Sequence, residues 1–393
     1  MPFDFDRHIE RRNTDSLKYD FAARRNKPAD ILPLWVADMD FRTPPAVVEA
    51  LVARAEHGIF GYSDSGDAYF AAVEGWFSRR FGFAVRPEWL VKTPGVVFAI
   101  SCAVRAFTEP GDAVLIQQPV YYPFTEAVQS NRRKLVVNEL VCRDGAYSID
   151  FAGFERQIKE NGVKAFILCS PHNPVGRVWT REELTRLGEI CLRHGVLVIS
   201  DEIHADFTYP GHTHTIFPNI APAFADNCVL CTAPTKTFNL AGLQISNIFI
   251  PNKALRHKFK QELTRVGYSQ VNVMGMDACR AAYAEGEQWL GELRVYLLQN
   301  LIFLREYVRD HMPGVRLVEP EGTYLVWLDF RALGLAGQAL DDLVVYKAGL
   351  WLDAGEIFGA GGAGFQRLNI ACPRAALERA LAKLAGALRE RER

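Results

Sequence analysis

Three polar side chains of different chemistry follow three apolar runs in the middle of the chain. Asn173 comes shortly after AFILCS, Asp201 comes directly after VLVIS, and Lys236 comes directly after CVLCTAPT. In open α/β sheets, ligands bind just beyond the carboxyl ends of the strands. We therefore expect an amide, a carboxylate and an amine to gather at one edge of a sheet.

These three groups match the chemical needs of pyridoxal phosphate (PLP). A lysine held against apolar residues has a lowered pKa and can form a Schiff base with an aldehyde. A carboxylate can keep the pyridine nitrogen protonated, and an amide can hydrogen-bond the ring hydroxyl. Taken singly, Asn173 is also typical of a turn, Asp201 of a helix start, and Lys236 of a solvated surface. The cofactor hypothesis depends on all three lying together.

Two further features would complete such a site. Thr93-Pro94-Gly95 precedes the apolar helical pattern VVFAISCAVRAF, so the backbone N–H groups of Val96 and Val97 would be free to bind a phosphate. Tyr121 follows another apolar run and could stack on a cofactor ring. Tyr122 is the second candidate for stacking, and ordinary half-buried packing is the alternative for both.

Short β-branched runs alternate with amphipathic stretches through the middle of the chain, which is the pattern of βαβ units. Thr180 and Glu183 have the spacing of a capping box at the start of one helix. At ~150 residues per domain, 393 residues predict two to three domains. We predict an α/β fold with a large PLP-binding domain over 48–285, in which helices enclose a mostly parallel sheet. Residues 1–47 and 286–393 would form a smaller α+β domain.

Composition excludes several classes of function. The 45 basic and 46 acidic residues leave a net charge of −1, which argues against nucleic-acid binding and against an anionic membrane surface. No apolar run reaches 18 residues, and the N-terminus lacks the apolar core of a signal peptide, so we expect a cytoplasmic protein. The lone CxxC at Cys228 and Cys231 lacks a second pair of ligands, and no metal site is predicted.

Seven motifs together resemble a known family. The runs SPHNPVGRVW, SDEIHADF and APTKTFNLAGL are similar to motifs of fold-type I PLP enzymes, the aspartate aminotransferase-like group. The runs WVADMDF, GYSD, PGVVFAI and QRLNIACPR resemble one branch of that group, the bacterial cystathionine β-lyases or C–S lyases, which includes modulators of the maltose regulon. The resemblance covers nearly the whole chain.

The resemblance implies a role for each candidate residue. Lys236 would form the Schiff base with the cofactor and act as the catalytic base. Asp201 would pair with the pyridine nitrogen, Asn173 would bind the ring hydroxyl, and Tyr121 would stack on the ring. The backbone at 96–97 would hold the phosphate.

Substrate and subunit contacts are implied in the same way. Arg367 would bind the substrate's α-carboxylate, a task suited to a bidentate guanidinium, with Asn173 and Tyr121 beside it. Tyr62 would reach the phosphate from a neighbouring subunit, which implies a homodimer. Trp351, Asp353 and Phe358 could help to shape the pocket for the substrate's side chain.

Some positions depart from the aminotransferase pattern. Gln244 stands where those enzymes usually have an arginine that faces the phosphate, and Ala233 stands where they have a serine. Thr235 or Thr232 would then supply the hydroxyl at the phosphate. His204 replaces the tyrosine that often lies beside the ring, and we include it among the cofactor-binding residues. These departures match the lyase branch better than the aminotransferases.

The hypothesis is PLP-dependent β-elimination at cysteine-derived amino acids, such as conversion of L-cystathionine to homocysteine, pyruvate and ammonia. Two alternatives stay open: an aminotransferase of class I/II, and a modulator that binds a protein regulator and retains lyase activity. The preferred sulfur substrate and the physiological pathway are not determined by these residues.

Overall fold

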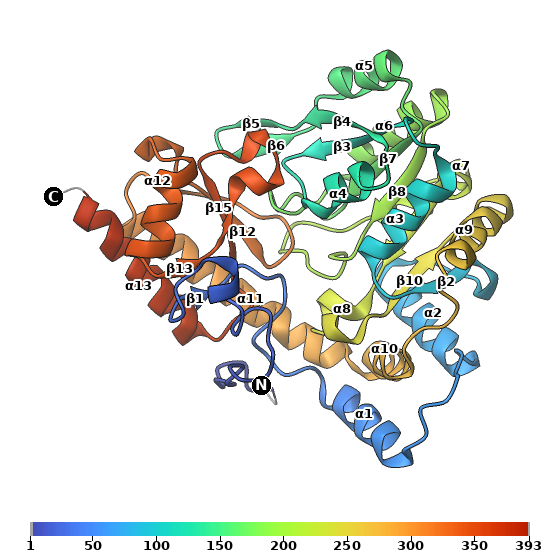
Figure 1. Ribbon diagram of the computed structural model, residues 1–393, viewed down its shortest axis with the longest axis horizontal. Helices are drawn as coiled ribbons and strands as arrows, with labels where there is room; N and C mark the ends of the chain where they lie inside the picture. Colours follow the sequence, from blue (N-terminus) through green and yellow to red (C-terminus); the bar gives the residue numbers. More distant parts are fainter. Residues whose placement is uncertain (1–2, 392–393) are drawn as a thin grey trace.

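A seven-stranded sheet forms the centre of the larger lobe in the computed structural model, which describes residues 3–391 (Figure 1). Its order is β2-β10-β9-β8-β7-β3-β4. Neighbouring strands from β4 to β9 are parallel, whereas β10 runs antiparallel to both of its neighbours. The strands are β2 (Leu90–Thr93), β3 (Ala113–Gln118), β4 (Lys134–Glu139), β7 (Ala165–Cys169), β8 (Leu197–Asp201), β9 (Cys228–Thr232) and β10 (Ser246–Phe249).

Helices cover both faces of this sheet because its strands are apolar on both sides. Leu115 and Phe166 face one core, whereas Val114 and Ile167 face a second core that includes helix α3. The helices of this lobe are α1 (Pro45–His57), α2 (Asp67–Phe81), α3 (Val96–Phe107), α4 (Pro123–Gln129), α5 (Phe151–Asn161), α6 (Arg181–Arg193), α7 (Pro222–Asp226), α8 (Pro234–Thr237), α9 (Lys253–Arg265) and α10 (Val273–Glu285).

The predicted capping box begins helix α6. The Thr180 hydroxyl accepts from the Glu183 N–H at 3.2 Å, and the Glu183 carboxylate accepts from the Thr180 N–H at 2.8 Å. Two of the helix's free N–H groups are thereby satisfied. The pattern read from the sequence is confirmed at this position.

A smaller four-stranded antiparallel sheet, ordered β11-β12-β15-β14, lies in the orange-to-red part of Figure 1. The long helix α11 leads into it from the larger lobe. The elements are α11 (Glu287–His311), β11 (Arg316–Val318), β12 (Leu325–Asp329), α12 (Gly337–Asp341), β14 (Asp353–Ala354), β15 (Phe365–Asn369) and α13 (Arg374–Arg391). The predicted α/β fold, with a mostly parallel sheet and a second small sheet, is confirmed.

Short elements complete the chain. The N-terminal strand β1 (Leu32–Pro33) pairs in parallel with β13 (Leu350–Trp351), which ties the N-terminal segment to the smaller lobe. Strands β5 (Val141–Arg143) and β6 (Ala146–Ser148) form a hairpin. The remaining turns are 3₁₀ helices at Ala23–Arg25, Pro87–Trp89, Phe217–Asn219, Ala241–Leu243, Arg331–Leu333, Gly355–Phe358 and Ala360–Gly362, and a π-helical turn at Asp342–Lys347. Within residues 3–391, no helix is both long and apolar enough to span a membrane.

Candidate active site

Asn173, Asp201 and Lys236 come together at the carboxyl ends of the neighbouring strands β7, β8 and β9, as predicted. Asp201 ends its strand, and Lys236 lies on α8, which begins two residues after β9. All three line one cavity of about 270 Å³. Its lining consists of Ala37, Pro94, Gly95, Val96, Val97, Phe98, Tyr121, Cys169, Asn173, Asp201, Ile203, His204, Thr235, Lys236, Ala241 and Gln244.

The amine of Lys236 is held in surroundings that favour its neutral form. Nζ donates a hydrogen bond to the Ala37 carbonyl at 2.7 Å. The pKa of this amine is lowered to about 8: burial is the main cause and the charge of Arg367 acts in the same direction, whereas the carboxylates of Asp38 and Asp201 oppose the shift. A lysine of this kind is able to act as a nucleophile or as a base near neutral pH.

Asp201 presents a buried carboxyl group to the same cavity. Burial raises its pKa to about 7, against the opposing effects of the Ile203 N–H, which donates to Oδ1 at 3.1 Å, and of the Lys236 charge. A carboxyl group with such a pKa can share a proton with a basic nitrogen placed beside it. The adjacent Glu202 is engaged elsewhere, because it accepts from Ser200 Oγ at 2.8 Å and pairs with His214 at 2.7 Å.

The first turn of α3 supplies an anion site at one end of the cavity. Gly95 precedes the helix with φ of +153°, and within the described chain no side chain caps the N–H groups that follow it. The first N–H groups of any helix lack partners inside that helix, and they bind phosphate well because the helix dipole is positive at this end. Val96 and Val97 lie here, and Thr235 lines the same cavity.

Tyr121, Asn173 and His204 complete the walls. The Tyr121 N–H donates to the Asn173 carbonyl at 3.0 Å, which fixes the two segments against each other. Burial lowers the pKa of His204 to about 3, and the charges of Lys236 and Arg367 act in the same direction. The imidazole is therefore neutral, and among residues 3–391 its buried Nδ1 has no hydrogen-bond partner.

Arg367 reaches the edge of the cavity from strand β15. Its side chain is buried, and Nη1 donates to Asn173 Oδ1 at 2.9 Å. Nη2 donates to the Trp35 carbonyl at 2.8 Å and contacts the carboxylate of Asp353. The guanidinium also lies over the ring of Phe358, with Cζ 4.9 Å from the centroid. A buried cation therefore stands beside the predicted ring-binding amide.

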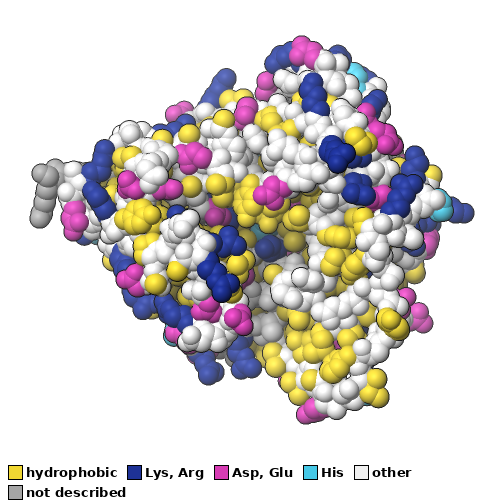
Figure 2. Space-filling model, in the orientation of Figure 1, with side chains coloured by type: hydrophobic (Ala, Val, Ile, Leu, Met, Phe, Trp, Pro, Cys, Tyr) yellow, Lys and Arg dark blue, Asp and Glu magenta, His cyan; other side chains and the backbone are white. Residues whose placement is uncertain are grey.

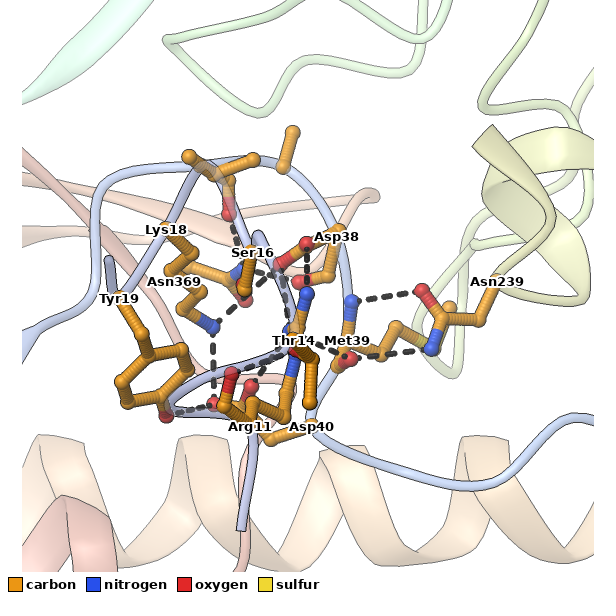
Figure 3. Close-up of polar contacts among 12 residues, drawn as sticks. Arg11, Thr14, Ser16, Lys18, Tyr19, Asp38, Met39, Asp40, Asn239 and Asn369 are labelled. Carbon is orange, nitrogen blue, oxygen red and sulfur yellow. Dashed lines mark hydrogen bonds and ion pairs between the residues drawn. The ribbon is translucent and has the colours of Figure 1, made fainter. Parts of the chain in front are cut away.

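Residues 35–41, which we call the N-terminal strap, pass over the site and hold its cations through backbone carbonyls. The Ala37 carbonyl accepts from Lys236 and from the Tyr324 hydroxyl, the latter at 3.1 Å. Asn369 Nδ2 donates to the carbonyls of Val36 and Asp38, both at 2.6 Å. On its other side, the strap is fixed by Asn239, which accepts from the Met39 N–H at 2.9 Å and donates to the Met39 carbonyl at 2.9 Å (Figure 3).

A buried ionic cluster anchors the strap (Figure 3). Lys18, which is 1% exposed, places Nζ 2.8 Å from Asp40 Oδ2 and 3.5 Å from Asp38 Oδ1. Arg11 pairs with the same two carboxylates at 2.6 and 2.7 Å, and the Tyr19 hydroxyl donates to Asp40 at 3.1 Å. The run WVADMDF was recognised from the sequence only as a family motif, and its role in this cluster was not predicted. The signal available in the sequence was the pair of acids in that motif, Asp38 and Asp40, together with the basic residues Arg11 and Lys18 upstream.

The structure brings nearly all the predicted site residues together. Eight of them line the single cavity: Val96, Val97, Tyr121, Asn173, Asp201, His204, Thr235 and Lys236. Arg367 adjoins it through Asn173. Tyr62 lies elsewhere, on the segment between α1 and α2, where it is 96% exposed and does not line the cavity of its own chain.

Figure 2 shows a hollow between the two lobes, bordered largely by hydrophobic side chains. The cavity offers an amine, a buried carboxyl group, an aromatic ring, an unpartnered imidazole nitrogen and a helix N-terminus. Together these residues fit a planar ring that carries an aldehyde, a basic nitrogen and a phosphate.

Comparison with known proteins agrees with this chemistry. The model of the family described as aminotransferase class I and II matches residues 29–384. The chain belongs to this family. It is 46% identical to cystathionine beta-lyase PatB of Bacillus subtilis, over 98% of this chain and 99% of that protein. It is 36% identical to the protein MalY of Escherichia coli, over 98% and 99% of the two chains.

A solved structure extends the likeness to three dimensions. Cystalysin from Treponema denticola, whose structure contains a pyridoxal 5′-phosphate cofactor, matches with a TM-score of 0.96 and 38% identity, over 99% of this chain and 100% of that chain. The branch of the family predicted from the sequence motifs is therefore confirmed.

Proposed function

We propose that this chain is a PLP-dependent carbon–sulfur lyase that carries out β-elimination on cysteine-derived amino acids such as L-cystathionine. The observation that carries the proposal is the lysine amine of lowered pKa, which faces a buried carboxyl group and stands near a buried arginine. Relatives with 46% and 33% identity are named cystathionine beta-lyases. Their similarity over almost the full chain supports the lyase over the aminotransferase alternative.

The cofactor would be held by groups already in place. The N–H groups of Val96 and Val97, with the hydroxyl of Thr235, would bind the phosphate, and Asp201 would keep the ring nitrogen protonated. Asn173 and His204 would lie beside the ring hydroxyl, and Tyr121 would stack on the ring. When bound, PLP supplies an electron sink for the carbanion formed at the substrate's Cα.

The chain's own residues would handle the substrate and its protons. Arg367 would bind the α-carboxylate and so orient the amino acid. Lys236 would remove the proton from Cα as the general base, because its lowered pKa leaves a useful fraction of neutral amine near pH 7. Loss of the thiolate from Cβ would then yield, after hydrolysis, pyruvate and ammonia.

The test is pyruvate release from L-cystathionine together with the visible absorbance of the purified protein. Lys236→Ala is expected to abolish both pyruvate release and the absorbance of covalently bound cofactor. Lys159→Ala, at an exposed lysine on α5, is the matched control and is expected to change neither. Amino transfer that depends on a keto acid, without pyruvate release from cystathionine, would overturn the lyase proposal in favour of an aminotransferase.

We further propose that the chain works as a homodimer in which Tyr62 serves the neighbouring subunit's site. Ile59, Phe60 and Tyr62 are 68%, 59% and 96% exposed, and three large exposed apolar side chains within four residues are typical of an interface. The large unit 48–285 would form the dimer, and residues 1–47 and 286–393 would form the smaller domain.

Mixing inactive variants tests the dimer. A Tyr62→Ala chain and a Lys236→Ala chain, refolded together in equal amounts, would form hybrids with one site that has both groups intact. Random pairing then restores about a quarter of wild-type activity. If Tyr62 acts within its own chain, the mixture gains nothing over its components.

A further inference from the structure

Arg367 is the cation proposed to bind the substrate's α-carboxylate, yet both of its Nη groups already donate hydrogen bonds within the chain, whereas its buried Nε has no hydrogen-bond partner among residues 3–391. Nη1 donates to Asn173, and Nη2 donates to both the Trp35 carbonyl and the Asp353 carboxylate. Bidentate binding of a carboxylate uses two adjacent N–H groups of the guanidinium. The guanidinium has two such edges, one formed by Nη1 and Nη2 and the other by Nε and Nη2. Each edge needs one hydrogen of Nη2, and both hydrogens of Nη2 already have acceptors here.

The fold holds Asp353 in this position. Asp353 on β14 lies directly opposite Arg367 on β15, with both side chains on the same face of the small sheet. Trp327 on β12 is the cross-strand neighbour of Arg367 on its other side. Asp353 is 6% exposed and Arg367 is 2% exposed. The strand register therefore holds the Asp353 carboxylate beside the Arg367 guanidinium in buried surroundings.

We propose that Asp353 competes with the substrate's α-carboxylate for Arg367, so that substrate binds together with one proton that Asp353 takes from water. This inference rests on the proposed function and deepens it. Two ionised carboxylates repel each other strongly when they share one buried site, and one of them then keeps a proton. Once protonated, Asp353 no longer forms an ion pair with Nη2 of Arg367, and its carboxyl group can donate a hydrogen bond to the incoming carboxylate.

Other ionisable groups face this pair and bear on the pH range. Burial raises the pKa of Asp353, whereas the charge of Arg367 lowers it. Tyr121 and Tyr122, from the segment between β3 and α4, also face Asp353, and burial raises the pKa of both phenols, so they remain neutral. Lys236 faces Arg367, and its free amine has a pKa of about 8. In the cofactor-loaded protein this amine would be joined to the cofactor, and comparison with an Asp353 variant separates any remaining effect of Lys236 from that of Asp353.

The experiment is calorimetric titration of the cofactor-loaded protein with propionate between pH 6 and 9. Propionate carries the carboxylate but has neither an amino group nor a leaving group. For the wild type, we expect the dissociation constant to rise with pH, approaching tenfold per pH unit once Asp353 is ionised. For Asp353→Asn, we expect binding at least tenfold tighter at pH 8 and a shallower profile. Arg367→Met is expected to abolish binding, which places propionate at this arginine.

Two results would overturn the inference. If Asp353→Asn binds propionate as weakly as the wild type or more weakly, Asp353 orients Arg367 and does not compete for it. If the wild-type profile is flat, no proton accompanies binding, and this measurement needs no variant to fold. The heat of binding is observed whether or not carbon–sulfur bonds are cleaved. If the protein releases no pyruvate but its affinity for propionate falls with pH as expected, the proposed function is contradicted and the inference about Asp353 is not.

Discussion

The pKa of Lys236 leads to a prediction about how the cofactor-free chain captures PLP. Only the neutral amine reacts with an aldehyde. Lowering the pKa from its ordinary value of 10.5 to about 8 favours the neutral form by about 3 kcal/mol, since each pKa unit corresponds to ~1.4 kcal/mol. At pH 7 about one amine in ten is then neutral, compared with about one in three thousand for an ordinary lysine.

The assay follows the rise in visible absorbance after PLP is mixed with protein that has been stripped of cofactor by hydroxylamine and dialysed. We expect the rate constant to increase with pH and to level off around a midpoint of about 8. The neighbouring charges give two variants with opposite directions. Asp38→Asn removes a charge that raises this pKa and should lower the midpoint, whereas Arg367→Met removes a charge that lowers it and should raise the midpoint.

A midpoint near 10.5 would refute the argument that burial controls this amine. Equal shifts in both variants, or none, would show that Asp38 and Arg367 do not act on Lys236 through their charges. Circular dichroism of each variant checks that the fold is retained before the midpoints are compared.

Two further predictions concern the N-terminal strap. Lys18→Met should lower the free energy of unfolding by up to about 3 kcal/mol, the lower end of the cost of breaking a buried ion pair, because Arg11 still pairs with the buried carboxylate of Asp40 and the half-buried carboxylate of Asp38. Denaturant unfolding measures this loss, and an effect no larger than that of exposed Lys159→Met would contradict it. Asn239→Ala removes three hydrogen bonds to the strap. At about 0.5–1.5 kcal/mol each, their loss should lower the free energy of unfolding by about 1.5–4.5 kcal/mol. An unchanged melting temperature in that variant would show that the ionic cluster and Asn369 hold the strap without Asn239.

The sequence predicted those parts of the site that depend on strand ends. Asn173, Asp201 and Lys236 each follow an apolar run, and parallel strands place such residues at one edge of the sheet whatever the details of packing. The phosphate end was predictable for a similar reason, because Pro-Gly before an apolar helical pattern indicates a free helix N-terminus.

The rest of the site depends on contacts between segments far apart in the chain. The Ala37 carbonyl meets Lys236 across 199 positions, and Arg367 meets Trp35 across 332. Backbone carbonyls carry no residue-specific signal, so no pattern in the sequence could have indicated them. The ion pair between Asp353 and Arg367 depends on strand register. Strand β14 has only two residues, which is too short for its sequence to predict that register.

The N-terminal strap is tied to both lobes at once. Asn369 of the small sheet donates to the Val36 carbonyl, and Asn239, just after α8 in the larger lobe, is hydrogen-bonded to Met39. The Ala37 carbonyl that accepts from Lys236 lies between these two attachments, so its position depends on the distance between the lobes. Since that contact is made by the backbone, it depends on the length of the strap and not on the side chain at position 37. A single-residue insertion there would detach the lysine from its acceptor while every site side chain remained intact.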